Sequence, residues 1–130
     1  MSPELAALST LALVHFATIF VAQRYLTRDI GRDGNMGTRE NLDAQLAPIT
    51  LRLRRASANF TENVGPFIIA VAVVVLAQKT STATALLAWA YVAARILYVP
   101  AYALGWQPWR SLIWMVGAIA TLALLILGLI

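Results

Sequence analysis

The chain of 130 residues has no cysteine and few charged residues, and each absence excludes a class of protein. Without cysteine there is no disulfide scaffold, no thiolate metal site and no cysteine nucleophile. Charged residues make up 12% of the chain, against about 25% in a soluble domain. Eleven of the 16 charged residues lie between Arg24 and Arg55, so the net charge of +4 does not indicate a nucleic-acid partner. The rest is nearly all apolar, which indicates a membrane protein.

Four apolar stretches are long enough to cross a bilayer as helices, which takes about 20 residues each. They are residues 3–26, 50–78, 82–104 and 108–130. None alternates between apolar and polar residues as the strands of a membrane barrel do. The sequence therefore predicts an all-α membrane protein, a bundle of four transmembrane helices that forms one domain over residues 1–130. No residues have the spacing of metal ligands, so no metal site is expected.

The basic residues are unevenly placed, which predicts how the bundle lies in the membrane. The first connection, residues 27–49, and its flanks hold seven of them: Arg24, Arg28, Arg32, Arg39, Arg52, Arg54 and Arg55. The connection 105–110 holds Arg110, and the opposite side holds only Lys79. Because basic residues concentrate on the cytoplasmic side, we expect both connections inside and both termini away from the cytoplasm.

A polar stripe runs along the start of the second span. At 100° per residue, six residues fall within an arc of about 100°: Arg52, Arg55, Asn59, Glu62, Asn63 and Pro66. The stripe climbs roughly 16 Å into the membrane at 1.5 Å per residue. Because a charge at the centre of a bilayer costs about 2.5–3.5 kcal/mol even on lenient scales, these side chains should meet each other, another helix or a wet cavity.

The third span carries a second stripe of Tyr91, Arg95, Tyr98 and Tyr102, within an arc of about 60°. Arg95 and Glu62 lie at similar depths, so we expect an ion pair between them that keeps Glu62 ionised and oriented. A structural ladder of ion pairs is one interpretation of the two stripes. The other is a cytoplasm-facing cleft for a small zwitterionic, net anionic ligand, because arginine binds carboxylates in pairs of hydrogen bonds and Glu62 would bind an amine.

Two motifs in these stripes resemble those of the MAPEG family, the membrane-associated proteins of eicosanoid and glutathione metabolism. Arg55-Ala-x-x-Asn59-x-x-Glu62-x-x-x-Pro66 is similar to the helix-two motif of the family, and Ala94-Arg95-x-x-Tyr98-x-x-x-Tyr102 to its helix-three motif. The chain resembles a bacterial-type member. The resemblance implies a homotrimer in the bacterial inner membrane, in contact with lipid, with glutathione as co-substrate in clefts between subunits.

The resemblance also implies residue roles. Glutathione would be bound by Arg55, Asn59 and Glu62, with Tyr102 lining the cleft and Arg52, Asn63 and Arg95 completing the polar set. Arg110 would lower the pKa of the glutathione thiol with help from Tyr98, since a nearby guanidinium favours the thiolate. A neighbouring subunit would add Arg24 or Arg28 from its first helix. Asn63 departs from the eicosanoid-forming members, which have tyrosine there, and Ser57 stands in place of their glutamine.

Three functions remain open on the sequence. The first is a glutathione transferase or peroxidase that acts on hydrophobic electrophiles dissolved in the membrane. The second is a non-catalytic protein that binds a lipid or an anionic metabolite in the same cleft, because membership of a family does not prove catalysis. The third is a small exporter coupled to protons through Glu62.

Overall fold

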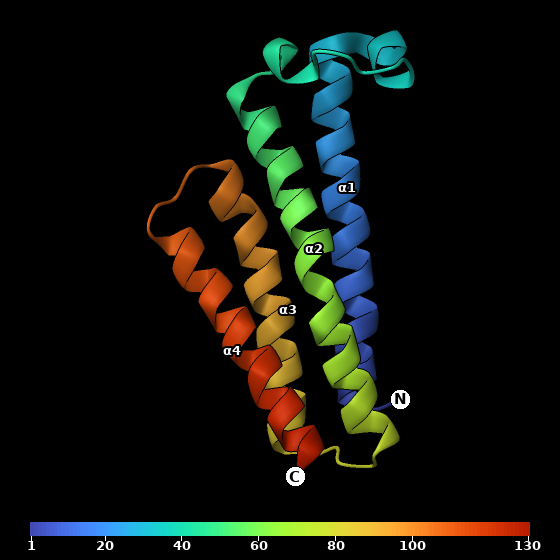
Figure 1. The fold of residues 1–130 in the computed structure, drawn as a ribbon, viewed down its shortest axis with the longest axis vertical. Coiled ribbons are helices and arrows are strands. Elements are labelled where there is room, and N and C mark those ends of the chain that lie inside the picture. Colours follow the sequence, from blue (N-terminus) through green and yellow to red (C-terminus); the bar gives the residue numbers. More distant parts are fainter.

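The computed structural model describes all 130 residues, and its long elements are all helices. They are α1 (Pro3–Met36), a short 3₁₀ turn η1 (Leu42–Gln45), α2 (Pro48–Leu76), α3 (Thr82–Ala103) and α4 (Trp109–Leu129). Each of the four α-helices is long and apolar enough to cross a membrane. Both termini lie at one end of the bundle, and the α1–α2 and α3–α4 connections lie at the other (Figure 1). The predicted fold class is confirmed.

Two of the four long helices, α1 and α3, begin at side chains that satisfy free backbone N–H groups. Ser2 caps α1 by accepting a hydrogen bond from the amide of Leu5 (3.2 Å). At the start of α3, Ser81 and Thr84 form a reciprocal capping box. The Thr84 hydroxyl also donates to the buried carboxylate of Glu4, which joins the first turns of α1 and α3 at the end where the termini lie.

The first helix continues past residue 26, where the apolar stretch ends. Its last turns, up to Met36, follow a break at Gly31, whose φ of 73° lies in the left-handed region that favours glycine. Beyond the break the chain turns across the end of the bundle (Figure 1). The expected connection 27–49 is therefore partly helical and packs over the end of the bundle, a form that its polar composition did not predict.

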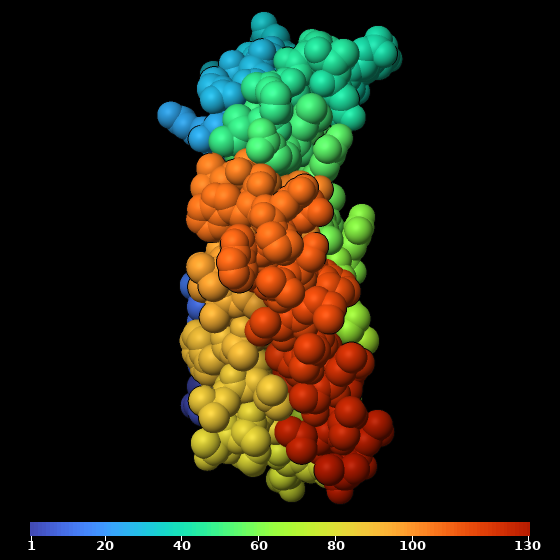
Figure 2. Space-filling view, turned by 90° about the vertical axis from the view of Figure 1, so that its left-hand side faces the viewer, coloured from blue at the N-terminus to red at the C-terminus, as the bar shows by residue number.

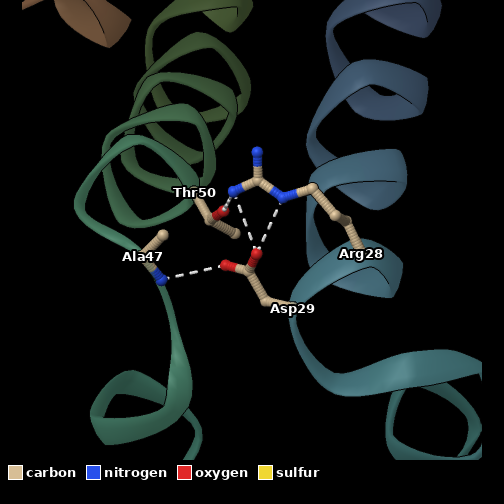
Figure 3. A network of polar contacts seen from close by, with 4 residues as sticks. All are labelled: Arg28, Asp29, Ala47 and Thr50. Atoms are coloured by element: carbon tan, nitrogen blue, oxygen red, sulfur yellow. Dashed lines mark hydrogen bonds and ion pairs between the residues drawn. The ribbon is translucent and has the colours of Figure 1, made fainter.

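A polar network holds the end of α1 against the start of α2 (Figure 3). The Arg28 guanidinium pairs with Asp29 at 2.9 Å and donates to the Thr50 hydroxyl, while Asp29 accepts from the amide of Ala47 at 2.9 Å. The Thr50 hydroxyl, the Ala47 amide and Arg28 hold the pKa of the Asp29 carboxyl, which lies beyond the apolar stretch 3–26, below its ordinary value of 3.8. This network positions the beginning of the α2 stripe.

Packing is dense in the half of the bundle that carries the termini and thin in the other half. The main core has twelve buried residues, among them Phe67, whose ring stacks on Tyr91 at 4.0 Å. The cluster near the connections has only three, Ala22, Leu53 and Ala103. In Figure 1, α4 lies close to α2 near the C-terminus and moves away from it toward the α3–α4 turn.

The outer surface is apolar, as a lipid-facing surface should be. Only 29 of the 130 residues are buried within the chain. Figure 2 shows one side of the molecule, where α4 runs along α3 and the segment after α1 lies above the α3–α4 turn. On α4, Leu112, Val116 and Ile119 are all more than half exposed. These side chains would face acyl chains or another copy of the protein.

Candidate functional site

A hollow of about 390 Å³ lies between α2, α3 and α4 at the end that carries the connections. Its wall contains four residues that the sequence singled out, each placed there by its own helix: Asn59 from α2, Tyr98 and Tyr102 from α3, and Arg110 from α4. Ser111, Trp114 and Met115 complete the lining. The structure therefore brings together both of the predicted catalytic residues and two of the predicted ligand-binding residues.

Two tyrosine rings lie between two arginines beside this hollow. The Arg110 guanidinium lies 4.7 Å from the centre of the Tyr102 ring. Tyr102 meets Tyr98 edge to face with ring centres 5.8 Å apart, and the Arg95 guanidinium lies 5.0 Å from the centre of the Tyr98 ring. Contacts of this kind hold a guanidinium in place without neutralising its charge. Neither arginine forms an ion pair with a carboxylate of the chain.

The predicted ion pair between Arg95 and Glu62 is wrong. Arg95 is 5% exposed and donates to the side-chain oxygen of Asn59 at 3.0 Å, and neither Arg95 nor Glu62 takes part in an ion pair. The direction of each side chain around the helix explains the error. Measured from Arg52, the buried face of α2 is centred at about 60°, Asn59 lies at about 340° and Glu62 at about 280°. Asn59, and not Glu62, is therefore the member of the stripe whose side chain meets Arg95.

A second hollow, of about 240 Å³, continues from the first toward the termini. Trp114 lines both hollows. Two residues of the predicted polar set, Asn63 and Arg95, line the second hollow, and the rest of its wall is mostly apolar. The Asn63 side chain donates to the backbone oxygen of Asn59 at 2.8 Å, and the Tyr91 hydroxyl donates to the backbone oxygen of Asn63 at 3.3 Å. We call the two hollows together the groove.

Three predicted residues of α2 are not among those that line the groove. Arg55 and Glu62 are exposed on α2 and have no hydrogen-bond or ion-pair partner within the chain. Arg52 donates to the backbone oxygen of Pro48 at 3.3 Å. Its guanidinium also reaches the α3–α4 turn at Gly105, where a Cβ would lie 3.0 Å from its Nη1. Glycine is favoured at this position, because its φ of 68° lies in the left-handed region.

Comparison with known families identifies the chain. The sequence profile of the MAPEG family matches residues 4–130, which is nearly the whole chain. The chain belongs to the MAPEG family. No curated protein and no solved structure matches it. With its four membrane-crossing helices, this MAPEG protein is an integral, multi-pass membrane protein of a family whose members generally use glutathione, assemble into oligomers and act in glutathione or lipid metabolism.

The contribution of α4 to the groove of this MAPEG protein was missed at the sequence level, Arg110 excepted. Ser111, Trp114, Ala118 and Thr121 line the two hollows and follow one another at spacings of three, four and three residues. This spacing puts them on one face of a helix. The signal was therefore present, but it is weak in a span where nearly every other residue is apolar.

The largest hollow of the chain, about 710 Å³, lies elsewhere, against the charged end of α1. Arg24 and Arg28 are two of its six lining residues. Neither arginine lines the groove of its own chain. The two residues that the family resemblance assigns to a neighbouring subunit thus share one surface of α1, outside the bundle.

Proposed function

We propose that this MAPEG protein is a membrane glutathione transferase or peroxidase. Its second substrate would be a hydrophobic electrophile dissolved in the bilayer, which the protein either conjugates to glutathione or reduces with glutathione. The observation that carries the proposal is the single hollow shared by Asn59, Tyr98, Tyr102 and Arg110. It offers an amide, two phenols and a guanidinium beside an apolar wall. No step of this chemistry requires a metal ion.

The charges around the groove suit glutathione, which carries two carboxylates, one ammonium group and one thiol. Arg55 and Arg52 would bind carboxylates, and Glu62 would bind the ammonium group. Asn59 would hold the peptide backbone, with Tyr102 alongside it. Arg95 and Asn63 lie deeper, where Arg95 would attract a carboxylate of the tripeptide. The apolar wall beside Trp114 would receive the second substrate from the lipid.

Arg110 is the residue we assign to thiol activation. A thiol with a pKa of about 8.5 is mostly protonated at pH 7, and a guanidinium beside it stabilises the thiolate, which is the nucleophile. Arg110 is half-buried and held over Tyr102, so its charge is only partly screened by water. The Tyr98 hydroxyl would donate a hydrogen bond to the same sulfur.

We further propose that the chain works as a homotrimer with glutathione between subunits. Arg55 and Glu62 are exposed in the single chain, although Glu62 lies well inside a membrane-crossing helix. Bare contact of such charges with acyl chains is costly, and a neighbouring subunit would cover them. The α1 surface of the neighbour that carries Arg24 and Arg28 would add positive charge above the groove. The basic connections would lie in the cytoplasm of a bacterial cell and the termini across the inner membrane.

The proposal is tested by glutathione consumption with the purified protein in lipid nanodiscs. An aryl halide and a lipid hydroperoxide serve as acceptors, and Arg55→Ala is compared with Arg54→Ala, an arginine of α2 outside the polar stripe. We expect turnover in the wild type that Arg55→Ala lowers at least about tenfold, since hydrogen bonds to a charged group contribute about 1.5–3 kcal/mol. Glutathione binding without turnover would identify a non-catalytic binding protein. Absence of both would refute the assignment.

A further inference from the structure

His15 is the only histidine of the chain, and it lies on the opposite side of Phe60 from the groove. It is 12 residues after the start of α1, or about 18 Å along the helix, near the middle of a hydrocarbon core about 30 Å thick. Its ring stacks on the buried Phe60 ring with centres 4.5 Å apart and planes 6° from parallel, and the Arg95 guanidinium lies 5.4 Å from the same Phe60 ring. The imidazole is therefore held in a fixed orientation.

One nitrogen of this imidazole has a partner and the other has none. Nε2 lies 3.0 Å from the Thr61 hydroxyl, and no hydrogen bond within the chain involves Nδ1. The Thr61 hydroxyl donates its proton to the backbone oxygen of Ser57 at 3.1 Å, so Nε2–H donates to Thr61 and Nδ1 is left as an acceptor. A polar atom therefore remains unpaired where water is scarce, which is unfavourable.

His15 also lines a hollow of about 200 Å³ between α1 and α2. The other five lining residues are apolar: Leu8, Leu11, Ala12, Val64 and Ile68. Ile68 is 43% exposed, so the hollow opens on the outer surface rather than into the core. Its volume is below the roughly 300–1,000 Å³ of sites that enclose a drug-sized molecule. It would therefore hold one end of a lipid-soluble ligand while the remainder stays in the bilayer.

We propose that this α1–α2 hollow binds a lipid-soluble molecule through a free hydroxyl group that forms a hydrogen bond with Nδ1 of His15. A hydroxyl suits the site because its O–H can donate a hydrogen bond to the Nδ1 acceptor. No charged side chain lines the hollow, so it offers nothing to pair with a charged head group. The ligand is thus a neutral alcohol or phenol with an apolar body. This site does not depend on glutathione binding.

The single histidine makes the test direct. Protein labelled with ¹⁵N only at histidine is placed in phosphatidylcholine nanodiscs and titrated with 4-nonylphenol or with nonylbenzene, which lacks the hydroxyl. We expect saturable binding of 4-nonylphenol and a shift of the Nδ1 resonance. Nonylbenzene should bind about three- to tenfold more weakly, because one neutral hydrogen bond is lost, and should leave the resonance in place.

Variants separate a ligand site from a purely structural contact between helices. Ala12→Leu fills the hollow and should abolish 4-nonylphenol binding, while Ala17→Leu, at an exposed alanine of α1 outside the hollow, should not. His15→Phe keeps an aromatic ring against Phe60 and should bind both probes equally weakly. The proposal is overturned if 4-nonylphenol does not move the resonance, if nonylbenzene moves it equally, or if Ala12→Leu and Ala17→Leu bind alike. A resonance that shifts on diluting the protein alone would mean that a second copy fills the hollow, and would also overturn it.

Discussion

Replacing Arg110 by alanine removes the charge that we assign to the glutathione thiol. Arg110 lies at the wall of the 390 Å³ hollow with its guanidinium over the Tyr102 ring. A thiol bound in this hollow lies beside a positive charge that is half-buried. Opposite charges within about 4–6 Å shift a pKa by about 1–3 units toward the charged form. We therefore expect the bound thiol to be partly or mostly ionised at neutral pH.

The size of the effect follows from the ordinary thiol pKa of about 8.5. At pH 7 such a thiol is about 3% thiolate. A shift of one unit raises this share to about 24%, and a shift of two units to about 76%, with each unit worth about 1.36 kcal/mol. Loss of Arg110 should therefore lower the bound thiolate about 8- to 25-fold, and the rate of any step that uses thiolate by a similar factor.

The assay is the ultraviolet absorbance of the thiolate, measured with saturating glutathione across a pH titration. Arg110→Ala should move the apparent pKa of the bound thiol up by at least one unit. Arg110→Lys, which keeps the charge, should recover most of the shift, and Arg54→Ala, outside the polar stripe of α2, should change nothing. If Arg110→Ala binds glutathione and ionises it like the wild type, the assignment of Arg110 is refuted.

Three further predictions concern the scaffold. Gly128→Ala should destabilise the bundle by about 1–3 kcal/mol, because its Cβ would lie 2.8 Å from a valine side chain of α2. Gly117→Ala, whose Cβ would make only ordinary contacts, should be neutral or stabilise the bundle by up to about 1 kcal/mol. Thermal melting in detergent compares the two variants. Asn59→Leu removes the only hydrogen-bond partner of Arg95 and should lower the melting temperature, whereas Asn59→Asp should not; equal melting of both would contradict the buried contact. Because the pKa of Asp29 is lowered in the folded state, its contribution to stability is present above about pH 4 and lost as the pH falls below that value. Asp29→Asn should lack this acid-dependent loss, and an unchanged pH profile of melting would disprove the role of the network.

The four helices and their order could be predicted from the sequence because apolar length alone specifies a membrane span. The break in α1 could not. Gly31 is followed by charged residues that would suit either a loop or a helix, and only its positive φ and the later contacts of Asn35 with Gln23 and Thr27 show how the chain turns back. Such contacts depend on tertiary structure and leave no periodic signal.

The candidate site was predictable along each helix but not between helices. Periodicity grouped Asn59 with Glu62 and matched Arg95 to their depth. It did not show which of the two faces α3, since their directions differ by about 60°. The part of α4 that closes the groove was not predicted either. Trp114 and Thr121 lie among apolar residues, and a helix that faced only lipid would have the same apolar composition.

The central claim is that the groove between α2, α3 and α4 holds glutathione. A solved structure of the protein in lipid with glutathione tests it most directly. We predict one tripeptide per chain in the hollow lined by Asn59 and Arg110, with a carboxylate at Arg55 and the ammonium group at Glu62. An empty or closed groove at saturating glutathione, with Glu62 turned toward acyl chains, would contradict the claim.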